Sequence, residues 1–460
     1  MDFKIKEINT RLNCFEISSL FKDEKNNILL DSSKEDSDLS KFSFLGVNPF
    51  LIFKSFGDII EVNGKKLKGN AFLELEKLID KYSLKNINSK LPFVSGAIGY
   101  ISYDAGRLIE DLPNTAKEDV KIPDVYFVFY DNLIIEDLKN NKKYISALGI
   151  LKDSKESIKE LEENINNGKK IKEEAFDFSK NKFYSNFSEQ EYIEGVKKVK
   201  DYIINGDIYI TNLTQRMWCY NNEDTFSIYK KLRTINKAPF SAYLNLDDFE
   251  VISSSPERFL NILNGKVETR PIKGTRRRGE TKEEDLKNKL ELKNSMKDKS
   301  ELLMIVDLER NDLSKVCKPH SVKVSELFKI EEYATVFHLV SNIEGRLKEG
   351  VSHVKCLKEC FPGGSITGAP KIRSQEIIEE IEKVRRGIYT GSIGYFDLRG
   401  NADFNIVIRT IVKKDGKAYF GVGGGITIDS EEKMEYEETL DKAKALMRVT
   451  QLLKNFYKTL

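Results

Sequence analysis

The 460-residue sequence predicts an α+β fold with largely antiparallel sheets. Strand-like and helical segments alternate irregularly along the chain, without the regular strand–helix–strand repeat that builds parallel sheets. Hydrophobic residues make up 40% of the chain and charged residues 32%, which indicates a folded protein with a real core. No internal repeat is apparent. A boundary near residue 185 divides the chain into an N-terminal region, 1–185, and a second region, 186–460.

Up to about residue 150, short apolar runs alternate with turn signals. Asn48-Pro49, Asn63-Gly64 and Asp131-Asn132 mark the predicted turns. The run 127–137 predicts a hairpin around the last of them. A charged, apolar-poor stretch over 152–182 then predicts a helix that ends in a mobile connection.

The second region predicts longer elements. Apolar residues recur at helical spacing over 188–204, and a Gly-Asp pair ends this helix before a strand that starts near Ile208. The remaining expected elements are paired strands over 249–263 and 266–271, a helix over 285–308, a strand-like run over 335–341, a glycine-rich strand over 417–427 and an amphipathic helix over 431–460.

Charge and cysteine content exclude several classes of protein. Lys and Arg total 75 against 73 Asp and Glu, so the basic excess of a nucleic-acid binder is missing. No apolar run approaches about 18 residues, and the N-terminus lacks an apolar signal segment, so we expect neither a membrane span nor export. Five scattered cysteines without C-x-x-C spacing disfavour a disulfide framework or a zinc site. We therefore expect a cytoplasmic protein.

Two acidic pairs have helical spacing. Asp298 and Glu301 lie three residues apart in one predicted helix, and Glu435 and Glu438 lie three apart in another. Each pair can present two carboxylates from one helix face. Two such pairs opposed would make a hard oxygen site suited to Mg²⁺. The alternative is that they belong to solvated helix surfaces.

Lys273 lies in the segment RPIKGTRRRG, between apolar strand residues and a glycine turn. Burial and neighbouring arginines would both favour its neutral amine, which is a nucleophile. The alternative is a basic turn that faces solvent.

Glycine runs at 423–425 and 362–371 could bring backbone N–H groups close to an anion, the second at the start of a helix. Neither has the order of a P-loop, and glycine runs alone are usually turns. His338 and Glu257 are ambiguous in isolation, because single residues of these types are also found in protein cores.

Eight segments of the chain occur in one fixed order. They are SSSPERFL, RPIKGTRRRG, ELLMIVDLERNDL, TVFHLVSNIEG, FPGGSITGAPKIRS, RRGIYTGSIGYF, FNIVIRT and VGGGITIDSEEKMEYEETLDKA. In this order they resemble the chorismate-utilising enzymes, which include anthranilate, aminodeoxychorismate, isochorismate and salicylate synthases. The resemblance covers 188–455 and, more weakly, LLDSS (29–33), FSFLG (42–46) and GAIGYISYDAGR (96–107). It implies two twisted, largely antiparallel sheets packed together, with helices outside.

The resemblance also implies a Mg²⁺ site. Glu301 and Glu438 match the family's metal ligands, and Asp298 and Glu435 match the acids that hold the metal's waters. The metal would bind the ring carboxylate of chorismate.

Further residues match positions that contact the substrate. Glu257 matches a candidate general acid for the departing C4 hydroxyl, and His338 matches a residue of the ring pocket. Positions implied to bind substrate are Thr275, Tyr389, Arg409, Gly423, Gly424 and Gly425. An arginine suits a carboxylate because its guanidinium forms two parallel hydrogen bonds.

Position 273 separates the subfamilies. The sequence PIKGT is similar to aminodeoxychorismate synthases, whereas anthranilate synthases have alanine at this position. The resemblance implies that Lys273 attacks C2 and expels the C4 hydroxyl, after which ammonia attacks C4 and expels the lysine. The product, 4-amino-4-deoxychorismate, leads to 4-aminobenzoate and folate. The alternative is anthranilate synthase component I.

One position departs from the family pattern. Ile210 stands where amine-adding members have glutamine and water-using members have lysine. An isoleucine cannot activate water, so it disfavours water as the nucleophile.

No glutaminase motif is found in the chain. By analogy, ammonia would come from a separate glutamine amidotransferase subunit in a heterodimer. The LLDSS and FSFLG segments resemble the tryptophan-binding region of anthranilate synthases. Here the pocket is structural, holds tryptophan or is empty, and we favour the structural role.

Overall fold

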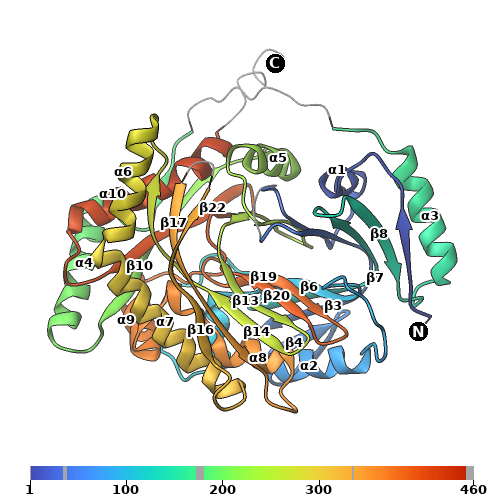
Figure 1. The fold of residues 1–460 in the computed structure, drawn as a ribbon, viewed down its shortest axis with the longest axis horizontal. Coiled ribbons are helices and arrows are strands. Elements are labelled where there is room, and N and C mark those ends of the chain that lie inside the picture. Colours follow the sequence, from blue (N-terminus) through green and yellow to red (C-terminus); the bar gives the residue numbers. More distant parts are fainter. Residues whose placement is uncertain (1, 35–38, 172–180, 334–335, 452–460) are drawn as a thin grey trace.

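The computed structural model describes residues 2–34, 39–171, 181–333 and 336–451. Within these ranges the strands form one continuous hydrogen-bonded network with two arms (Figure 1). The arms share the two longest strands, β3 (Phe42–Phe56) and β7 (Val125–Asp137), which pair antiparallel from end to end.

The first arm continues outward from β3 and, on the other side of β7, ends with β8 (Lys142–Ala147) and then the N-terminal strand β1 (Lys4–Ile8). Its further strands are β2 (Asn27–Asp31), β11 (Phe240–Asn245), β12 (Glu250–Ser255), β21 (Thr410–Lys414), β22 (Lys417–Ile426), β10 (Ile210–Tyr220), β9 (Tyr184–Ser185) and β18 (Gly368–Ala369).

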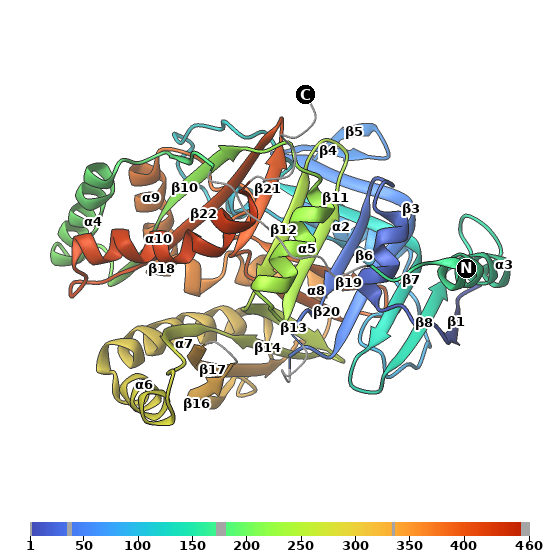
Figure 2. The same ribbon diagram turned by 90° about the horizontal axis from the view of Figure 1, so that it is seen from above.

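The second arm leaves the other ends of the same two strands. Its further strands are β5 (Lys65–Lys68), β4 (Ile59–Val62), β6 (Gly96–Ile101), β19 (Ser392–Asp397), β20 (Ala402–Asn405), β13 (Arg258–Leu263), β14 (Lys266–Arg270), β17 (Val336–Arg346), β15 (Ile272–Arg277) and β16 (Lys323–Glu332). All the pairings named are antiparallel, as the sequence predicts. Figure 2 shows the two arms as layers, joined at the side by β3, β6 and β7.

Two of the three predicted turns are wrong, and so is the predicted hairpin over 127–137. Asn48-Pro49 lies inside β3 and Asp131-Asn132 lies inside β7, where the two strands cross from one arm to the other. Asn48 adopts φ 56°, and the register shifts just after it. A neighbouring segment of the protein provides hydrogen-bond partners for one of these polar side chains. The Asp131 carboxylate accepts from the Ile150 and Leu151 N–H groups at 2.9 and 3.0 Å. Asn63-Gly64 forms the predicted turn, between β4 and β5.

Helices cover the outer faces of both arms. They are α1 (Cys14–Ser18), α2 (Ala71–Lys81), α3 (Ser154–Asn167), α4 (Glu189–Ile204), α5 (Thr225–Ile235), α6 (Lys282–Asn294), α7 (Met296–Val316), α8 (His353–Cys360), α9 (Lys371–Glu382) and α10 (Glu432–Val449), with short 3₁₀ turns η1 (Ser19–Phe21), η2 (Tyr103–Leu108) and η3 (Gly364–Ile366).

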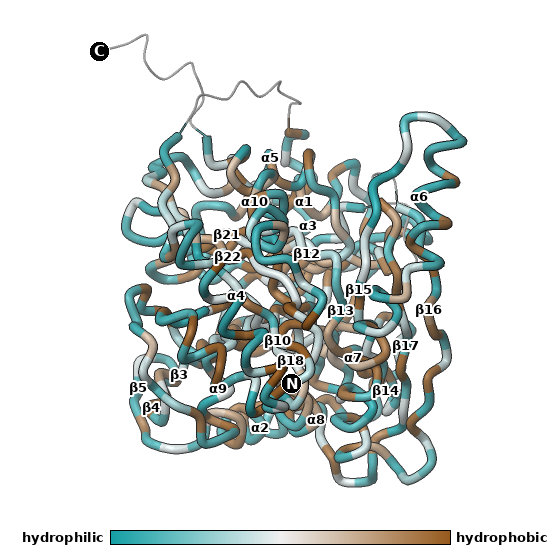
Figure 3. The backbone as a smooth tube through the Cα atoms, turned by 90° about the vertical axis from the view of Figure 1, so that its left-hand side faces the viewer, coloured by the Kyte–Doolittle hydropathy of each residue, from teal (hydrophilic) through white to brown (hydrophobic). Residues whose placement is uncertain are grey.

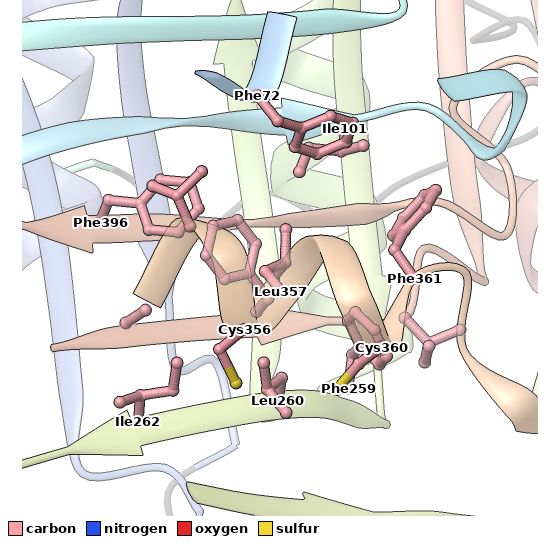
Figure 4. Packing of buried hydrophobic residues seen from close by; sticks show 14 of the residues in the cluster. Phe72, Ile101, Phe259, Leu260, Ile262, Cys356, Leu357, Cys360, Phe361 and Phe396 are labelled. Atoms are coloured by element: carbon pink, nitrogen blue, oxygen red, sulfur yellow. The ribbon is translucent and has the colours of Figure 1, made fainter. Parts of the chain in front are cut away.

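Four hydrophobic cores correspond to this layering among the described residues, and the smallest packs α4 and α9 against β10. One lies between the arms and contains Tyr100, Tyr126, Tyr130 and Val251. A second packs the first arm against α1, α3, α5 and α10. The third packs the second arm against α2, α7 and α8, and Figure 4 shows Phe259 and Leu260 of β13 pointing toward Cys356 and Cys360 of α8. Figure 3 shows brown, hydrophobic stretches around β10 and β18 between teal stretches of surrounding chain. Two packed sheets with outer helices are therefore confirmed.

Most helix predictions are confirmed, with changed bounds. The helix predicted over 188–204 is α4, and Ser188 caps it by accepting from the Glu191 N–H. The helix predicted over 285–308 is two helices, because Ser295 adopts an extended conformation and caps α7. The helix predicted to reach residue 460 is α10, and its last predicted residues, 452–460, lie outside the described residues, as do 172–180 of the charged stretch.

One strand prediction needs correction. The predicted strand 249–263 is two strands, β12 and β13, and only β13 pairs with β14. The predicted glycine-rich strand over 417–427 is β22, and Gly423–Gly425 lies within it. The strand-like run over 335–341 is the start of β17, apart from Thr335, which is not described.

The predicted regions 1–185 and 186–460 share both arms. β2 pairs with β11 and β6 pairs with β19, so strands from both sides of residue 185 lie next to each other. The division remains a sequence-based prediction, and the site described below depends on strands and helices from the second region.

Candidate active site

Lys273 points to the place where β15, β22 and η3 meet. Its Nζ donates to the Ser365 carbonyl oxygen at 3.0 Å. It also lies 3.4 Å from the position that a Cβ on Gly425 would occupy. The side chain is half-buried. The alternative of a basic turn that faces solvent does not describe Lys273, because its amine is turned inward.

Gly274 bends β15 next to this lysine. It adopts φ +76°, and the register with β17 shifts between Lys273 and Thr275. A Cβ at Gly274 would stand 2.9 Å from Asp298 Cβ. Only glycine therefore lets the first turn of α7 approach the strand so closely.

The arginines that follow Lys273 in the sequence contact acids. Arg276 donates to Glu291 at 2.8 Å and to Asp298 at 3.1 Å, and Arg278 donates to Asp285. Arg277 is 78% exposed. Arg276 and Arg278 are therefore paired with acids. The charged groups that interact with Lys273 are carboxylates.

The acidic quartet comes from two helices, as the sequence predicts. Asp298 and Glu301 lie in the first turns of α7, and Glu435 and Glu438 in the first turns of α10. A Cβ at Gly424 would lie 3.3 Å from Glu435 Oε2 and 3.5 Å from Glu438 Oε1. The glycine run of β22 thus lies directly against the α10 pair.

The pKa values of these acids reflect how close the acids lie to one another. Burial raises the pKa of Glu301, and Asp298 and Glu435 raise it further, against Lys273. Burial likewise raises the pKa of Glu435, which accepts from Ser430 Oγ at 2.7 Å.

Glu438 differs from the other acids. Burial acts to raise its pKa but is outweighed, chiefly by Lys442, so the pKa is lowered. Lys442 Nζ lies 2.5 Å from Glu438 Oε1 and donates to the Gly423 carbonyl at 2.8 Å. Sequence reasoning missed Lys442, although its spacing of four residues from Glu438 on a helix was a usable signal.

The donor chemistry fits a hard divalent cation. All four side chains offer oxygen only, which suits Mg²⁺ over Zn²⁺. The pKa values of Glu301 and Glu435 are raised, mainly by burial and further by neighbouring acids, and a bound cation would offset both effects. Within the described part of the chain, however, no three His, Cys, Asp or Glu side chains already converge on one point. The quartet therefore supplies suitable ligands without forming a closed set.

Glu257 lies beside Lys273, in the turn between β12 and β13. It is 5% exposed, and its Oε1 accepts from the Ile272 N–H at 3.4 Å. Burial raises its pKa to about 6, against the opposing effects of the Ser365 hydroxyl and Lys273. A carboxyl group of this kind can hold a proton near neutral pH and give it to a leaving group.

His338 and Thr275 form a pair across β15 and β17. Thr275 Oγ1 and His338 Nδ1 are 2.9 Å apart. Burial lowers the pKa of His338 to about 4. The imidazole is therefore neutral at physiological pH, which suits a wall of a binding pocket better than an acid catalyst.

Arg409 directly precedes β21, and Tyr389 lies in the connection between α9 and β19 against β22. Burial lowers the pKa of Arg409, and its Nη1 donates to the Lys442 carbonyl at 2.6 Å. Tyr389 lies against Gly421, where a Cβ would stand 2.2 Å from the ring. Burial raises the pKa of Tyr389, and Arg409 acts to lower it, so the two side chains are close.

One further contact at Lys273 was not singled out by sequence reasoning: the Ser365 carbonyl is the acceptor for the amine. Ile210, the residue that departs from the family pattern, places its Cδ1 3.2 Å from the Cβ position of Gly425. Ile210, 2% exposed, thus forms an apolar wall on the side of the glycine that Lys273 approaches.

The LLDSS motif (29–33) includes the end of β2 in the first arm. Its polar side chains form hydrogen bonds within the protein. Asp31 accepts from Arg233 at 2.6 Å and from Tyr229 at 2.9 Å. Ser32 Oγ donates to the Phe42 carbonyl at 2.7 Å, and Ser33 Oγ to the Ala238 carbonyl at 3.1 Å. These bonds support the structural role.

Among residues 2–34, 39–171, 181–333 and 336–451, no helix combines the length and the apolar character needed to cross a bilayer.

Comparison with known proteins identifies the family. The family model described as chorismate binding enzyme matches residues 25–448. The chain belongs to this family. The chorismate-binding enzymes share the fold, since the crystal structure of anthranilate synthase component I from Streptococcus pneumoniae TIGR4 superposes with a TM-score of 0.81 at 31% identity, covering 90% of this chain and 93% of that one.

Relatives from two subfamilies are about equally similar. Anthranilate synthase component 1 of Acetivibrio thermocellus is 38% identical over 91% of this chain and 89% of its own length. Aminodeoxychorismate synthase component 1 of Bacillus subtilis (strain 168) is 36% identical over 95% of this chain and 94% of its own length. The enzyme of that name from Salmonella typhimurium is 42% identical over 78% of this chain and 77% of its own length. The chain is thus a chorismate-utilising enzyme, and overall identity does not choose between the two reactions.

Proposed function

We propose that this chain is the chorismate-aminating component of an aminodeoxychorismate synthase. The observation that carries the proposal is the inward-facing amine of Lys273, bonded to Ser365 and close to Gly425. An amine held among Glu257, Glu301 and the β22 glycines is positioned for covalent chemistry, and an alanine at 273 would leave no nucleophile there.

In the proposed first step, the lone pair of Lys273 Nζ attacks C2 of chorismate. The ring double bond shifts, the C4–O bond breaks, and Glu257 gives its proton to the hydroxyl, which departs as water. In the second step, ammonia attacks C4, the double bond shifts back, and the C2–Nζ bond breaks to restore the neutral amine. The ionised Glu257 takes the extra proton from the new C4 ammonium, which returns Glu257 to its acid form.

The remaining residues would bind and orient the substrate. Arg409 and Tyr389 would hold the enolpyruvyl carboxylate beside the N–H groups of the β22 glycines. His338, neutral and bonded to Thr275, would form a wall of the ring pocket. Ile210 would keep water away from the face of the ring that Lys273 attacks.

Glu301 and Glu438 would ligate Mg²⁺, and Asp298 and Glu435 would hold its waters. When bound, the metal would neutralise the ring carboxylate and draw electron density from C2. We further propose a cytoplasmic enzyme that receives ammonia from a separate glutamine amidotransferase subunit and feeds folate biosynthesis.

Anthranilate synthase component 1 is the second candidate. It is supported by the 38% identity over 91% of this chain to a protein of that name. In that reaction ammonia would attack C2 directly, and Lys273 would stand in the path that ammonia must take.

One assay separates the candidates. The purified chain is incubated with chorismate, Mg²⁺ and ammonium, with and without a lyase that releases 4-aminobenzoate from aminodeoxychorismate, and the products are identified by chromatography. We expect 4-aminobenzoate only with the lyase. Fluorescent anthranilate without the lyase would overturn the proposal in favour of the second candidate.

A further inference from the structure

We infer that Lys371 is a positioning residue for the nucleophile, because it holds the segment that presents the Ser365 carbonyl to Lys273. The inference rests on the proposed function, in which the Lys273 amine attacks chorismate. Lys273 Nζ donates to this carbonyl at 3.0 Å, so the place of the carbonyl sets the direction of the amine. Lys371 itself is the first residue of α9, and its side chain is 12% exposed.

The Lys371 ammonium group has an acceptor for each of its hydrogens within the protein. Its Nζ donates to the Asp312 carboxylate at 2.5 Å, the Cys360 carbonyl at 2.9 Å and the Pro362 carbonyl at 2.8 Å. An ammonium group has three N–H donors, so this set is complete. The two carbonyls belong to the connection between α8 and η3, and Figure 4 shows Cys360 at the end of α8.

This connection leads directly into η3. The Pro362 carbonyl is held by Lys371, and the Ser365 carbonyl follows three residues later. The turn that contains Ser365 is closed by the Thr367 hydroxyl, which donates to the Gly363 carbonyl at 2.9 Å. A displacement of the Pro362 carbonyl would therefore be carried to the Ser365 carbonyl through a short, hydrogen-bonded turn.

The other end of the link is α7. Asp312 lies on this helix, whose first turns carry Asp298 and Glu301. The η3 turn also packs against α7, since a Cβ at Gly364 would stand 2.9 Å from Leu308 Cδ2. The buried ammonium group therefore ties the acceptor of the nucleophile to the helix that supplies two of the four acids proposed for the metal site. The nucleophile and the metal-bound ring would thus keep one relative position.

The direction of the amine matters because the proposed step forms a covalent bond. Such a step needs reacting atoms about 3–3.5 Å apart, and a misplacement of about 1 Å can lower the rate about 100-fold. Burial of an ammonium group costs free energy that its three acceptors offset. In return, the donors restrict the directions of two main-chain carbonyls, which an apolar side chain of similar size would not do.

The ion pair with Asp312 alone does not account for Lys371. Lys315 also donates to Asp312, at 3.1 Å, from a side chain that is 46% exposed. Within the described residues, Lys315 Nζ donates to neither carbonyl of the connection. The two lysines therefore share one acid and differ in whether they hold the connection, which makes Lys315 the matched control.

The test is the first step of the proposed reaction, followed without ammonia. The full chain is mixed with chorismate and Mg²⁺, quenched at intervals and analysed by intact-protein mass spectrometry. Joining Lys273 to C2 with loss of water adds the mass of chorismate minus that of water. We expect K371M to form this adduct about 10- to 100-fold more slowly than the wild type, and K315M to form it at the wild-type rate. Chorismate affinity, measured by calorimetry in a Lys273→Ala background, should be nearly the same with and without K371M.

A second variant separates position from stability. K371M leaves Asp312 with one partner instead of two, whereas K371M/D312N removes both charges and should recover most of any loss in melting temperature. The connection still lacks its donor in both. Slow adduct formation by K371M/D312N, with normal chorismate affinity and a melting temperature near that of the wild type, supports the inference.

Three results would count against it. Adduct formation by K371M at the wild-type rate overturns the inference. Recovery of the rate together with the melting temperature in K371M/D312N also overturns it, because Lys371 would then only stabilise the fold. Absence of the adduct in the wild type is distinguishable from both, since it overturns the proposed covalent reaction and the inference with it.

Discussion

Two polar clusters of this protein contain similar residues and differ in how their charges are paired. At the end of β2, Asp31 accepts hydrogen bonds from Arg233 and Tyr229 at 2.6 and 2.9 Å. Around Lys273, burial instead raises the pKa of Glu257 to about 6 and that of Glu301 above its ordinary value. Paired charges hold a fold together, whereas carboxyl groups held near one another at raised pKa cost stability and are typical of sites that work on a ligand.

The most severe test of this contrast is Lys273→Ala. We expect loss of at least about 1000-fold in amination, with chorismate binding and the melting temperature nearly unchanged, because the nucleophile is lost from a half-buried position. Steady-state assays with the lyase coupled measure it. Arg277→Ala, at a 78% exposed neighbour, is the control that should keep its activity. Normal output from the alanine variant at 273 would remove the lysine from the mechanism.

Glu301→Gln should have the next largest effect. We expect about a 100-fold loss of activity and a higher Mg²⁺ requirement, since a metal ligand would be gone while the fold stays intact. Titration of activity with Mg²⁺ measures both. Asp307→Asn on the same helix, where the side chain is 63% exposed, should match the wild type. An unchanged Mg²⁺ response would contradict the assignment.

Glu257 gives a pH-dependent prediction. Its pKa in the folded protein, about 6, lies above the ordinary 4.5, so the acid form needed for catalysis is lost as pH rises through 6. The same shift means that its contribution to stability is full below about pH 4.5 and is lost as pH rises past 6. Glu257→Gln should lower the rate about 10- to 100-fold and raise the free energy of unfolding at pH 7 by up to ~2 kcal/mol. Rate profiles over pH and denaturant-induced unfolding test this prediction. If the rate of the variant still falls with rising pH as the wild-type rate does, Glu257 is not the proton donor.

Asp31→Asn should have the smallest effect on catalysis and a clear effect on the fold. Removing the buried Asp31 charge leaves the half-buried Arg233 without its carboxylate, which should cost up to about 3 kcal/mol of unfolding free energy. Activity per folded molecule should stay within about twofold of the wild type. Asp23→Asn, at an exposed position, serves as the control. Unimpaired stability with impaired catalysis would reverse the contrast between the clusters.

Local patterns predicted much of the fold and the members of the site. The i, i+3 acidic pairs and the apolar spacing of α4 were visible because they depend on short-range helix geometry. The interiors of β3 and β7 were not, because Asn48-Pro49 and Asp131-Asn132 have the composition of turns and are kept in strands by partners distant in sequence.

The same limit applies to the site. The resemblance supplied the roles, but the sequence could not show that Arg276 and Arg278 pair with acids, or that Ser365 receives the Lys273 amine. These contacts join segments separated by bends, such as the one at Gly274, whose geometry depends on packing against α7.

The sharing of β3 and β7 by both arms has a consequence for how the chain is made. β2 emerges from the ribosome long before its partner β11, and β6 emerges long before its partner β19, which starts at residue 392. During synthesis the first half therefore has strand edges without neighbours, which favour association with other chains. Such distant pairings also slow folding. A fragment that ends near residue 185 should aggregate, and co-expression of the two fragments should recover soluble protein.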